Sequence, residues 1–539
     1  MSPRIALGLL ALLCGVARAD PAVDALLERY RRAREVEERL AVVQQLNRPE
    51  AVQALAEVLR VDPEERVRLR VVEALVGLGT DAAGRALLQA VDRWDPFVVE
   101  AVVRGLSGRG LPAETVEWIL AHGLREGTPD QQAALVTLLS GLERKDALPA
   151  IKRAAAGERP WRLRAAAASA LSHLDPAGSA ADIRRLAGDE HLRVRVAALE
   201  GLERVPGDAA AKLLRKAARS DSDWQARLAA LRALSARDPQ GSRPLQLEVL
   251  KDLDLHLALR LSALELLEGW QDPRGVEARI EALKAADGRL ELALVRSLQG
   301  LTAQPHTTHA QWKAWWREAR EGWAFPAAPP PPADDPMRTR VRFYDLPIES
   351  SSVCFVLDAS GSMNEPAGPA RDTSRAPGAA PPPGAPTKWE VARKELEKAL
   401  SALPEGSKFG LVLFSERVAP LQTTPVPASK KNVAAALALL DQHPPQGATD
   451  LHAPLALLFH AGEPDDPGAA ARVAFDTLVL LSDGLPTAGV VQDAPELLRR
   501  VKGWNRFARV RIHTVGLGEQ NKELLQGLAR DGGGQYASR

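Results

Sequence analysis

Three short segments in the second half of the chain place oxygen-bearing side chains next to apolar runs. Two of them end such runs and the third precedes a helical stretch: Asp358-Ala359-Ser360-Gly361-Ser362, Ser482-Asp483-Gly484 and Gly447-Ala448-Thr449-Asp450. Carboxylate and hydroxyl oxygens are the ligands that a hard cation such as Mg²⁺ prefers. The binding of a divalent ion is therefore the first chemistry to consider at these residues.

The elements that must position these segments follow an alternating pattern. From Val341 onward, short runs that are apolar on both faces alternate with helical stretches. Such runs are typical of a parallel sheet covered by helices on both faces. We predict strands at 353–357, 409–414, 477–482 and 510–515, and helices at 388–403, 430–440, 451–460, 495–501 and 519–529. In open sheets of this kind, the ligand site lies beyond the carboxyl ends of the strands.

Taken together, the three segments resemble the metal-ion-dependent adhesion site of von Willebrand factor type A (VWA) domains. That motif combines Asp-x-Ser-x-Ser with a distant Thr and a distant Asp-Gly. The segment Thr514-Val515-Gly516-Leu517-Gly518 is also similar to the family, and the resemblance covers roughly Val341 to Tyr536. It implies a Rossmann-like α/β domain with a mostly parallel sheet. It also implies a divalent ion, Mg²⁺ or else Mn²⁺ or Ca²⁺, held by Asp358, Ser360, Ser362, Thr449 and Asp483.

The same resemblance implies how such a site works. Ser360, Ser362 and Thr449 would be direct ligands, whereas Asp358 and Asp483 would act largely through water. With few carboxylates in direct contact, the ion keeps positive charge and can accept an Asp or Glu side chain from a protein partner. We therefore expect an adhesion or scaffold protein and not an enzyme. Two alternatives stay open: a structural scaffold in which the ion only stabilises the loops, and an accessory subunit of a larger complex.

The first half of the chain is built from repeats. Leucines recur at intervals of about 31 to 33 residues, which is the spacing expected of two helices per unit; they are Leu75, Leu106, Leu139, Leu171, Leu202, Leu234, Leu267 and Leu298. The arginines and the Ala-Leu endings of these helices resemble HEAT-like repeats. The period is close to that of tetratricopeptide and ankyrin repeats, but their signatures are absent. We predict an α-solenoid whose surface docks other proteins, with an irregular helical bundle as the alternative.

Aromatic and proline-rich segments separate the two halves. Trp312, Trp315 and Trp316 share one helix face and predict a cap on the solenoid core, with a ligand-binding platform as the alternative.

These patterns divide the chain into a signal peptide (1–19), a solenoid with a Trp-rich cap (20–325), a Pro-rich linker (326–340) and the VWA-like domain (341–539). An insertion at 364–387, rich in Pro, Ala and Gly, is expected to be disordered. It is either a tolerated surface insertion or a lid or partner-binding arm beside the metal loop.

The N-terminal residues predict export. Arg4, an apolar run and Ala17-Arg18-Ala19 form a signal peptide with cleavage before Asp20, which leads to a periplasmic, cell-surface or extracellular location. Cleavage would leave Cys354 as the only cysteine, in a pattern that predicts a buried, inert thiol. Lys and Arg total 70 against 69 Asp and Glu, a net charge of +1. This balance favours neither nucleic acid nor an anionic membrane, and no membrane span is expected.

Overall fold

The computed structural model describes residues 20–90, 96–109, 111, 113–286, 288–326, 341–348, 350–367, 385–404, 406–461, 468–483, 485–518 and 521–539. The predicted signal peptide, nearly all of the predicted linker and residues 368–384 of the predicted insertion lie outside the described residues. The chain divides into two compact units, Met1–Pro206 and Gly207–Arg539, so the second unit holds the last repeats as well as the α/β domain. None of the described helices is both long and apolar enough to cross a membrane.

Paired helices make up the first unit, as the leucine spacing predicts. Its helices are α2 (Pro21–Arg32), α3 (Val36–Gln45), α4 (Val52–Val61), α5 (Glu65–Leu78), α6 (Asp81–Ala90), α7 (Pro96–Arg109), α8 (Ala113–Trp118), α9 (Leu124–Glu126), α10 (Pro129–Gly141), α11 (Leu148–Ala154), α12 (Trp161–Leu174), α13 (Ala180–Leu186) and α14 (Leu192–Gly201). Helix α12 packs against both α10 and α14. Its buried residues include Ala167, Ala168 and Leu171, and the small alanines let neighbouring helices approach closely.

A charged contact links successive repeats in this unit. Arg164 of α12 forms a bidentate pair with Asp189, in which Nε and Nη2 donate to the two carboxylate oxygens at 2.8 and 2.7 Å. Asp189 stands in the turn before α14 and also accepts a hydrogen bond from the backbone N–H of His191. Both partners are almost fully buried. The pair therefore ties α12 to the turn before α14 by two parallel charge-assisted hydrogen bonds.

Helical repeats continue at the start of the second unit. They are α15 (Asp208–Ser220), α16 (Trp224–Arg237), α17 (Arg243–Lys251), α18 (Leu257–Leu266), α19 (Pro273–Leu283), α20 (Gly288–Thr302) and α21 (His309–Ala319). Helix α21 packs on α19 and buries Trp312 and Trp316. Trp316 Nε1 donates to Glu277 of α19 at 3.3 Å. Trp312 and Trp316 are therefore packed among the helices, and Trp312 is not exposed as a ligand-binding platform would be.

The α/β domain is built on a six-stranded sheet in the order β5-β4-β3-β6-β7-β8. Every neighbouring pair is parallel except β4 with β5, which is antiparallel. The strands are β3 (Ser352–Asp358), β4 (Lys408–Phe414), β5 (Val418–Pro427), β6 (Thr477–Ser482), β7 (Arg511–Gly516) and β8 (Gly533–Ser538), and a separate hairpin joins β1 (Arg342–Phe343) to β2 (Leu346–Pro347). The mostly parallel sheet is confirmed; β5 and β8 are additions at its two edges.

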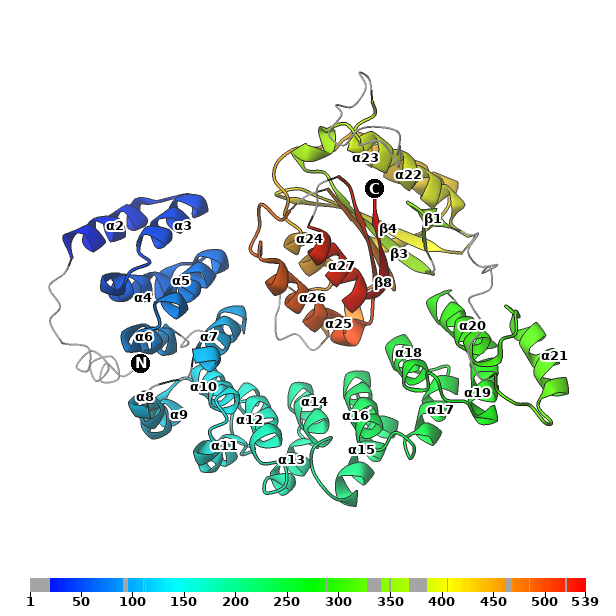
Figure 1. The fold of residues 1–539 in the computed structure, drawn as a ribbon, viewed down its shortest axis with the longest axis horizontal. Helices are drawn as coiled ribbons and strands as arrows, with labels where there is room; N and C mark the ends of the chain where they lie inside the picture. The colour runs from blue at the N-terminus through cyan, green and yellow to red at the C-terminus, as the bar shows by residue number, and fades with distance from the viewer. Residues whose placement is uncertain are drawn as a thin grey trace. The chain divides into compact units, whose positions relative to one another are not determined.

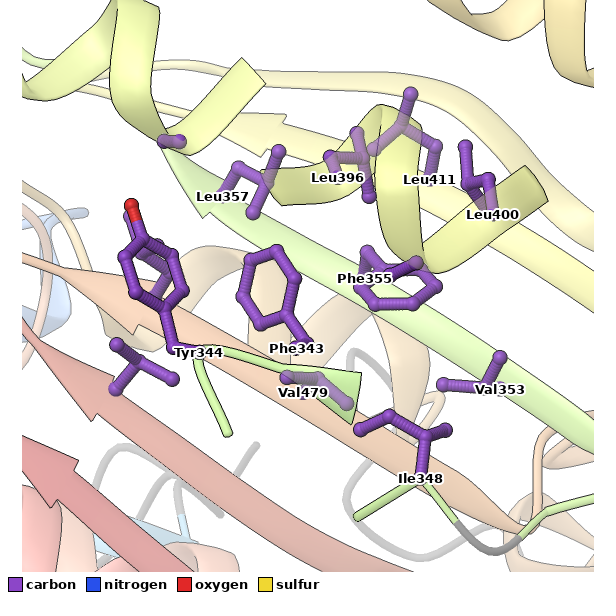
Figure 2. Close-up of a cluster of buried hydrophobic side chains, with 14 of the residues drawn as sticks. Phe343, Tyr344, Ile348, Val353, Phe355, Leu357, Leu396, Leu400, Leu411 and Val479 are labelled. Atoms are coloured by element: carbon purple, nitrogen blue, oxygen red, sulfur yellow. The ribbon is translucent and has the colours of Figure 1, made fainter. Parts of the chain in front are cut away.

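Helices cover both faces of the sheet (Figure 1). They are α22 (Lys388–Ala402) and α23 (Lys430–Asp441) on one face, and α24 (His452–Leu458), α26 (Ala494–Ala508) and α27 (Lys522–Asp531) on the other, with the short α25 (Ala469–Arg472) before β6. Figure 2 shows the first face, where Phe343 of the hairpin meets Phe355 of β3 at a ring-centroid distance of 5.4 Å. Cys354 points to the opposite core and is fully buried, as predicted. Burial raises the pKa of its thiol.

Candidate metal centre

Asp358 is the last residue of β3 and anchors the site. Its carboxylate is fully buried. Oδ1 accepts a hydrogen bond from the backbone N–H of Ser360 at 2.9 Å, and Oδ2 accepts one from the hydroxyl of Ser482 at 2.7 Å. Because β3 and β6 are parallel neighbours with Leu357 opposite Leu481, the next residues of both strands emerge at the same edge of the sheet. The topology therefore brings Asp358 to the loop that carries Asp483.

A chain of side-chain hydrogen bonds continues from this point. The hydroxyl oxygens of Ser360 and Ser362 lie 3.1 Å apart, and the hydroxyl of Ser362 donates to Asp483 Oδ1 at 2.8 Å. Ser360 and Asp483 are buried, whereas Ser362 is half-buried. Four of the five predicted ligands, Asp358, Ser360, Ser362 and Asp483, thus lie within one connected group. Both carboxylates hold two hydrogen bonds from neighbouring groups.

Thr449 comes from a third loop, which backbone hydrogen bonds attach to the Asp358 loop. The N–H of Gly361 donates to Gly447 O at 2.9 Å, and the N–H of Gln446 donates to Ala359 O at 2.8 Å. Gly447 has a φ of +78°, and a Cβ there would also lie 3.1 Å from the side chain of Glu416. The buried Thr449 is held through its backbone: its N–H donates to Thr487 Oγ1 at 3.0 Å, and its carbonyl accepts from Thr487 and Ala488. The fifth predicted residue therefore stands in a loop adjoining the group.

Lys388 adds a positive charge to the site. Its Nζ donates to Asp483 Oδ2 and to a carboxylate oxygen of Glu365, both at 2.8 Å. The Lys388 side chain is 10% exposed and that of Asp483 is fully buried, but the Glu365 side chain is 64% exposed. The strong pair is therefore Lys388–Asp483, because solvent screens the contact with Glu365.

Burial shifts the pKa values of Asp358 and Lys388 in opposite directions, because it disfavours the charged form of each group. Burial raises the pKa of Asp358 to about 6, although the hydrogen bonds from Ser360 and Ser482 oppose that change. The nearby charge of Asp483 adds to the increase. For Lys388, burial alone would lower the pKa, but the hydrogen bonds from its ammonium to Asp483 and Glu365 raise it above its ordinary value. At neutral pH Lys388 is therefore a cation, and Asp358 carries its charge at a desolvation cost.

The chemistry of this donor set suits a hard divalent ion. The five predicted residues offer three hydroxyls and two carboxylates, all of them oxygen donors of the type that Mg²⁺ and Mn²⁺ accept. Within the described residues, no three or more His, Cys, Asp or Glu side chains gather in a way that could hold a metal. A metal here would therefore depend on hydroxyl oxygens and water for most of its ligands. The buried, desolvated Asp358 is a group that a cation would stabilise.

Three residues of the site were missed from the sequence. Ser482 ends an apolar run next to Asp483, and its strand position was the one available signal. Lys388 begins a predicted helix far along the chain from both carboxylates, and Glu365 lies at the start of the predicted insertion. Only the fold shows that they meet, because Pro366 pairs with Thr387 and brings the two ends of the insertion together.

Comparisons with known proteins match each half of the chain to a different family. A family model described as von Willebrand factor type A domain matches residues 384–538, which begin after the Asp358 loop. A model described as HEAT repeats matches residues 23–107 and 155–235. The chain contains HEAT repeats and a VWA domain. Together these modules indicate a role in protein interaction or scaffolding.

Individual relatives cover only parts of the chain. Inter-alpha-trypsin inhibitor heavy chain H1 of Mesocricetus auratus is 27% identical over 172 residues, which are 31% of this chain and 16% of that protein. Among solved structures, a von Willebrand factor type A protein from Catenulispora acidiphila is 20% identical and covers 35% of this chain and 38% of its own, with a TM-score of 0.26. A structure of Kap95p binding to RanGDP covers 56% of this chain and 47% of its own at 16% identity, with a TM-score of 0.40.

Proposed function

We propose that this protein binds partner proteins, and that its VWA domain holds a carboxylate of one partner through a divalent ion. The observation that carries the proposal is the connected group of Asp358, Ser360, Ser362 and Asp483 at the carboxyl ends of β3 and β6. This edge is where open parallel sheets place their ligands. The family resemblance of the same residues supports the choice of a metal ion.

The ion would be held by Ser360, Ser362 and Thr449, with Asp358 and Asp483 close by. When bound, it would supply a concentrated positive charge that attracts a negatively charged oxygen ligand from outside the domain. The protein's part is to keep the oxygens in place. Asp358 is fixed by Ser360 and Ser482, and such outer hydrogen bonds orient the groups around a metal.

The proposal assigns binding, not catalysis, to the site. Both carboxylates already accept two hydrogen bonds from neighbouring groups, so their oxygens serve to hold ligands in position. A purely structural ion is the alternative. Backbone hydrogen bonds from Gly361 to Gly447 and from Gln446 to Ala359 join the loops directly, which favours a ligand-binding role over a loop-stabilising one.

We further propose that the HEAT repeats dock other proteins and that the protein is exported. Solenoids present extended surfaces for partners, which supports the first proposal. The pattern of Arg4, an apolar run and Ala17-Arg18-Ala19 supports the second. N-terminal sequencing of the protein recovered outside the cytoplasm should begin at Asp20. A sequence that begins at Met1 would contradict cleavage before Asp20, and a protein found only in the cytoplasm would contradict export.

The binding proposal is tested by capturing partners with the full-length protein. Crosslinking pull-downs from the native host are run with Mg²⁺ and with a chelator, using the wild type, Thr449→Ala and the control Thr423→Ala. Thr423 is an exposed residue of β5, so its loss removes a similar side chain away from the site. We expect one captured protein to require both Mg²⁺ and Thr449, and to be lost when a single acidic residue of its own is replaced by its amide.

Two results would decide against this function. Capture that is equal with Mg²⁺ and with chelator would leave the structural scaffold as the better explanation. Capture that depends on Mg²⁺ but survives every acid-to-amide substitution in the partner would contradict the carboxylate as the bound group.

A further inference from the structure

Lys388 places a positive charge among oxygen-bearing side chains that would themselves hold a cation. Its ammonium lies 2.8 Å from Asp483 Oδ2, while Asp483 Oδ1 accepts the hydroxyl hydrogen of Ser362. The contact is almost fully buried. A buried ion pair of this kind keeps most of its electrostatic strength, because little solvent screens it.

The fold holds Lys388 in this position from several sides. Thr387 caps helix α22 and forms a capping box with Glu390, so the helix begins at Lys388. The backbone N–H of Lys388 donates to Glu365 O at 2.9 Å, and Ala367 N donates to Pro386 O at 2.8 Å, which closes the base of the insertion. The outer part of the side chain passes over Gly518, where a Cβ would lie 3.4 Å from Cε. The local fold therefore fixes the Lys388 ammonium beside Asp483.

The charge balance of the site follows from this arrangement. Asp358 and Asp483 together would neutralise a divalent ion, and Lys388 then leaves one surplus positive charge among buried groups. Glu365 offsets part of that surplus, but it is mostly exposed and its charge is screened. We propose that Lys388 is a permanent positive charge in the metal site that weakens ion binding and makes the loaded site select an anionic partner group. This inference rests on the proposed function.

A simpler role for Lys388 predicts the opposite effect on the ion. If Lys388 only positioned Asp483, its removal would loosen that carboxylate and weaken metal binding. If its charge matters, its removal relieves a repulsion and strengthens metal binding, while the attraction for an anion falls. Removing the charge of Lys388 should therefore strengthen metal binding and weaken anion binding. A purely positioning role does not produce this combination.

The first experiment titrates the full-length protein with Mn²⁺ alone in a calorimeter. The variants are Lys388→Met, which removes the charge and keeps an unbranched side chain one atom shorter, and the control Lys394→Met, at an exposed position on the same helix. We expect Lys388→Met to bind Mn²⁺ at least about tenfold more tightly than the wild type, and the control to stay within about twofold. Glu365→Gln should weaken Mn²⁺ binding slightly, because it removes an anion that offsets Lys388. Weaker binding by Lys388→Met, or tighter binding by Glu365→Gln, would overturn the inference.

The second experiment measures the anion with trifluoroacetate as the probe. Mn²⁺ bound to the protein broadens the ¹⁹F resonance of a carboxylate that binds beside it, so the broadening reports binding even when it is weak. We expect Lys388→Met to reduce the broadening per bound Mn²⁺ severalfold relative to the wild type and Lys394→Met. Equal broadening in all three would overturn the role of Lys388 in anion selection. A wild type that binds Mn²⁺ but never broadens the probe would instead refute the carboxylate-binding function.

Discussion

The HEAT repeats and the VWA domain both bury charged side chains, but they satisfy them differently. In the repeats, Arg279 is fully buried and donates to Ser297 Oγ, Gly275 O and Leu267 O, each at 2.8 Å. Its donors thus reach three different acceptors within the helical repeats. In the VWA domain, Asp358 accepts hydrogen bonds from the backbone N–H of Ser360 and the hydroxyl of Ser482. Asp483 accepts hydrogen bonds from the hydroxyl of Ser362 and the ammonium of Lys388.

The charge of Arg279 stabilises the packing of the repeats, whereas the charge of Asp358 is available to a bound cation. Burial lowers the pKa of Arg279 to about 10, which still leaves it charged at neutral pH. Burial raises the pKa of Asp358 to about 6, so this carboxylate is protonated at a pH only slightly below neutral. The arginine is satisfied without help, whereas the carboxylate would gain from a cation. Four predictions test this contrast.

The largest effect is expected where the arginine is removed. Arg279→Leu removes the charged donor of three buried acceptors, Ser297 Oγ, Gly275 O and Leu267 O, and leaves Leu267 O with only its 3.2 Å bond from the N–H of Trp270. We expect a loss of about 3 to 4 kcal/mol in the free energy of unfolding. The measurement is chemical denaturation of the full-length protein, with Arg317→Leu as the control because that side chain is 76% exposed. Equal stability of the two variants would show that Arg279 does not hold the repeat together.

A change of the opposite sign is expected in the VWA domain. Asp358→Asn removes a buried negative charge and keeps the shape of the side chain. In metal-free protein at pH 7 we expect it to stabilise the domain by on the order of 2 kcal/mol. The same variant should lose any rise in melting temperature that Mg²⁺ gives the wild type. Calorimetric melting with and without Mg²⁺ measures both, and destabilisation of the metal-free domain would show that the charge of Asp358 is satisfied without a cation.

The third prediction concerns pH. Because the pKa of Asp358 is about 6 when folded and lower when unfolded, the folded state holds the proton more tightly. This contribution to stability is fully present below about pH 4 and is lost as the pH rises through 6. The advantage of Asp358→Asn over the metal-free wild type should therefore fall by about half between pH 7 and pH 5. Denaturation of both proteins at these pH values tests this, and an advantage that grows on acidification would refute it.

The smallest effect is expected at an exposed pair in the repeats. Arg219 Nε lies 3.0 Å from a carboxylate oxygen of Glu248, and both side chains are about half exposed (51% and 54%). Solvent screening leaves such pairs little net energy, so Glu248→Gln should change stability by less than about 0.5 kcal/mol. Denaturation at low and high salt provides the check. A larger loss that disappears in salt would mean that surface charge, and not only buried charge, holds the repeats together.

The sequence predicted the elements whose patterns are local. Regular leucine spacing indicated the repeats, and runs that are apolar on both faces indicated β3, β4, β6 and β7. Strand β5 was missed because it is half-exposed and contains Pro420 and Pro425, which break a strand pattern. Strand β8 was missed because it begins with Gly533 and Gly534, which are weak strand formers.

The residues of the site that follow strands could be predicted from the sequence, but Lys388 could not. Asp358, Ser360, Ser362 and Asp483 follow strands whose parallel pairing brings their ends together, so their meeting followed from the fold class. The partner of Asp483 did not, because Lys388 is 95 residues away and begins a helix. Contacts of this kind depend on how a helix packs on the sheet, which no local pattern reports.

We propose that Asp358 and its neighbours hold a divalent ion, and a Mg²⁺ titration is the sharpest test of that site. The full-length wild type, Asp358→Ala and the control Asp441→Ala, which removes an exposed carboxylate at the end of α23, are each titrated in a calorimeter. We expect the wild type and the control each to bind one ion, and Asp358→Ala to bind none. A wild type that binds no Mg²⁺, or an Asp358→Ala variant that binds it as well as the control, would rule out a metal site at Asp358.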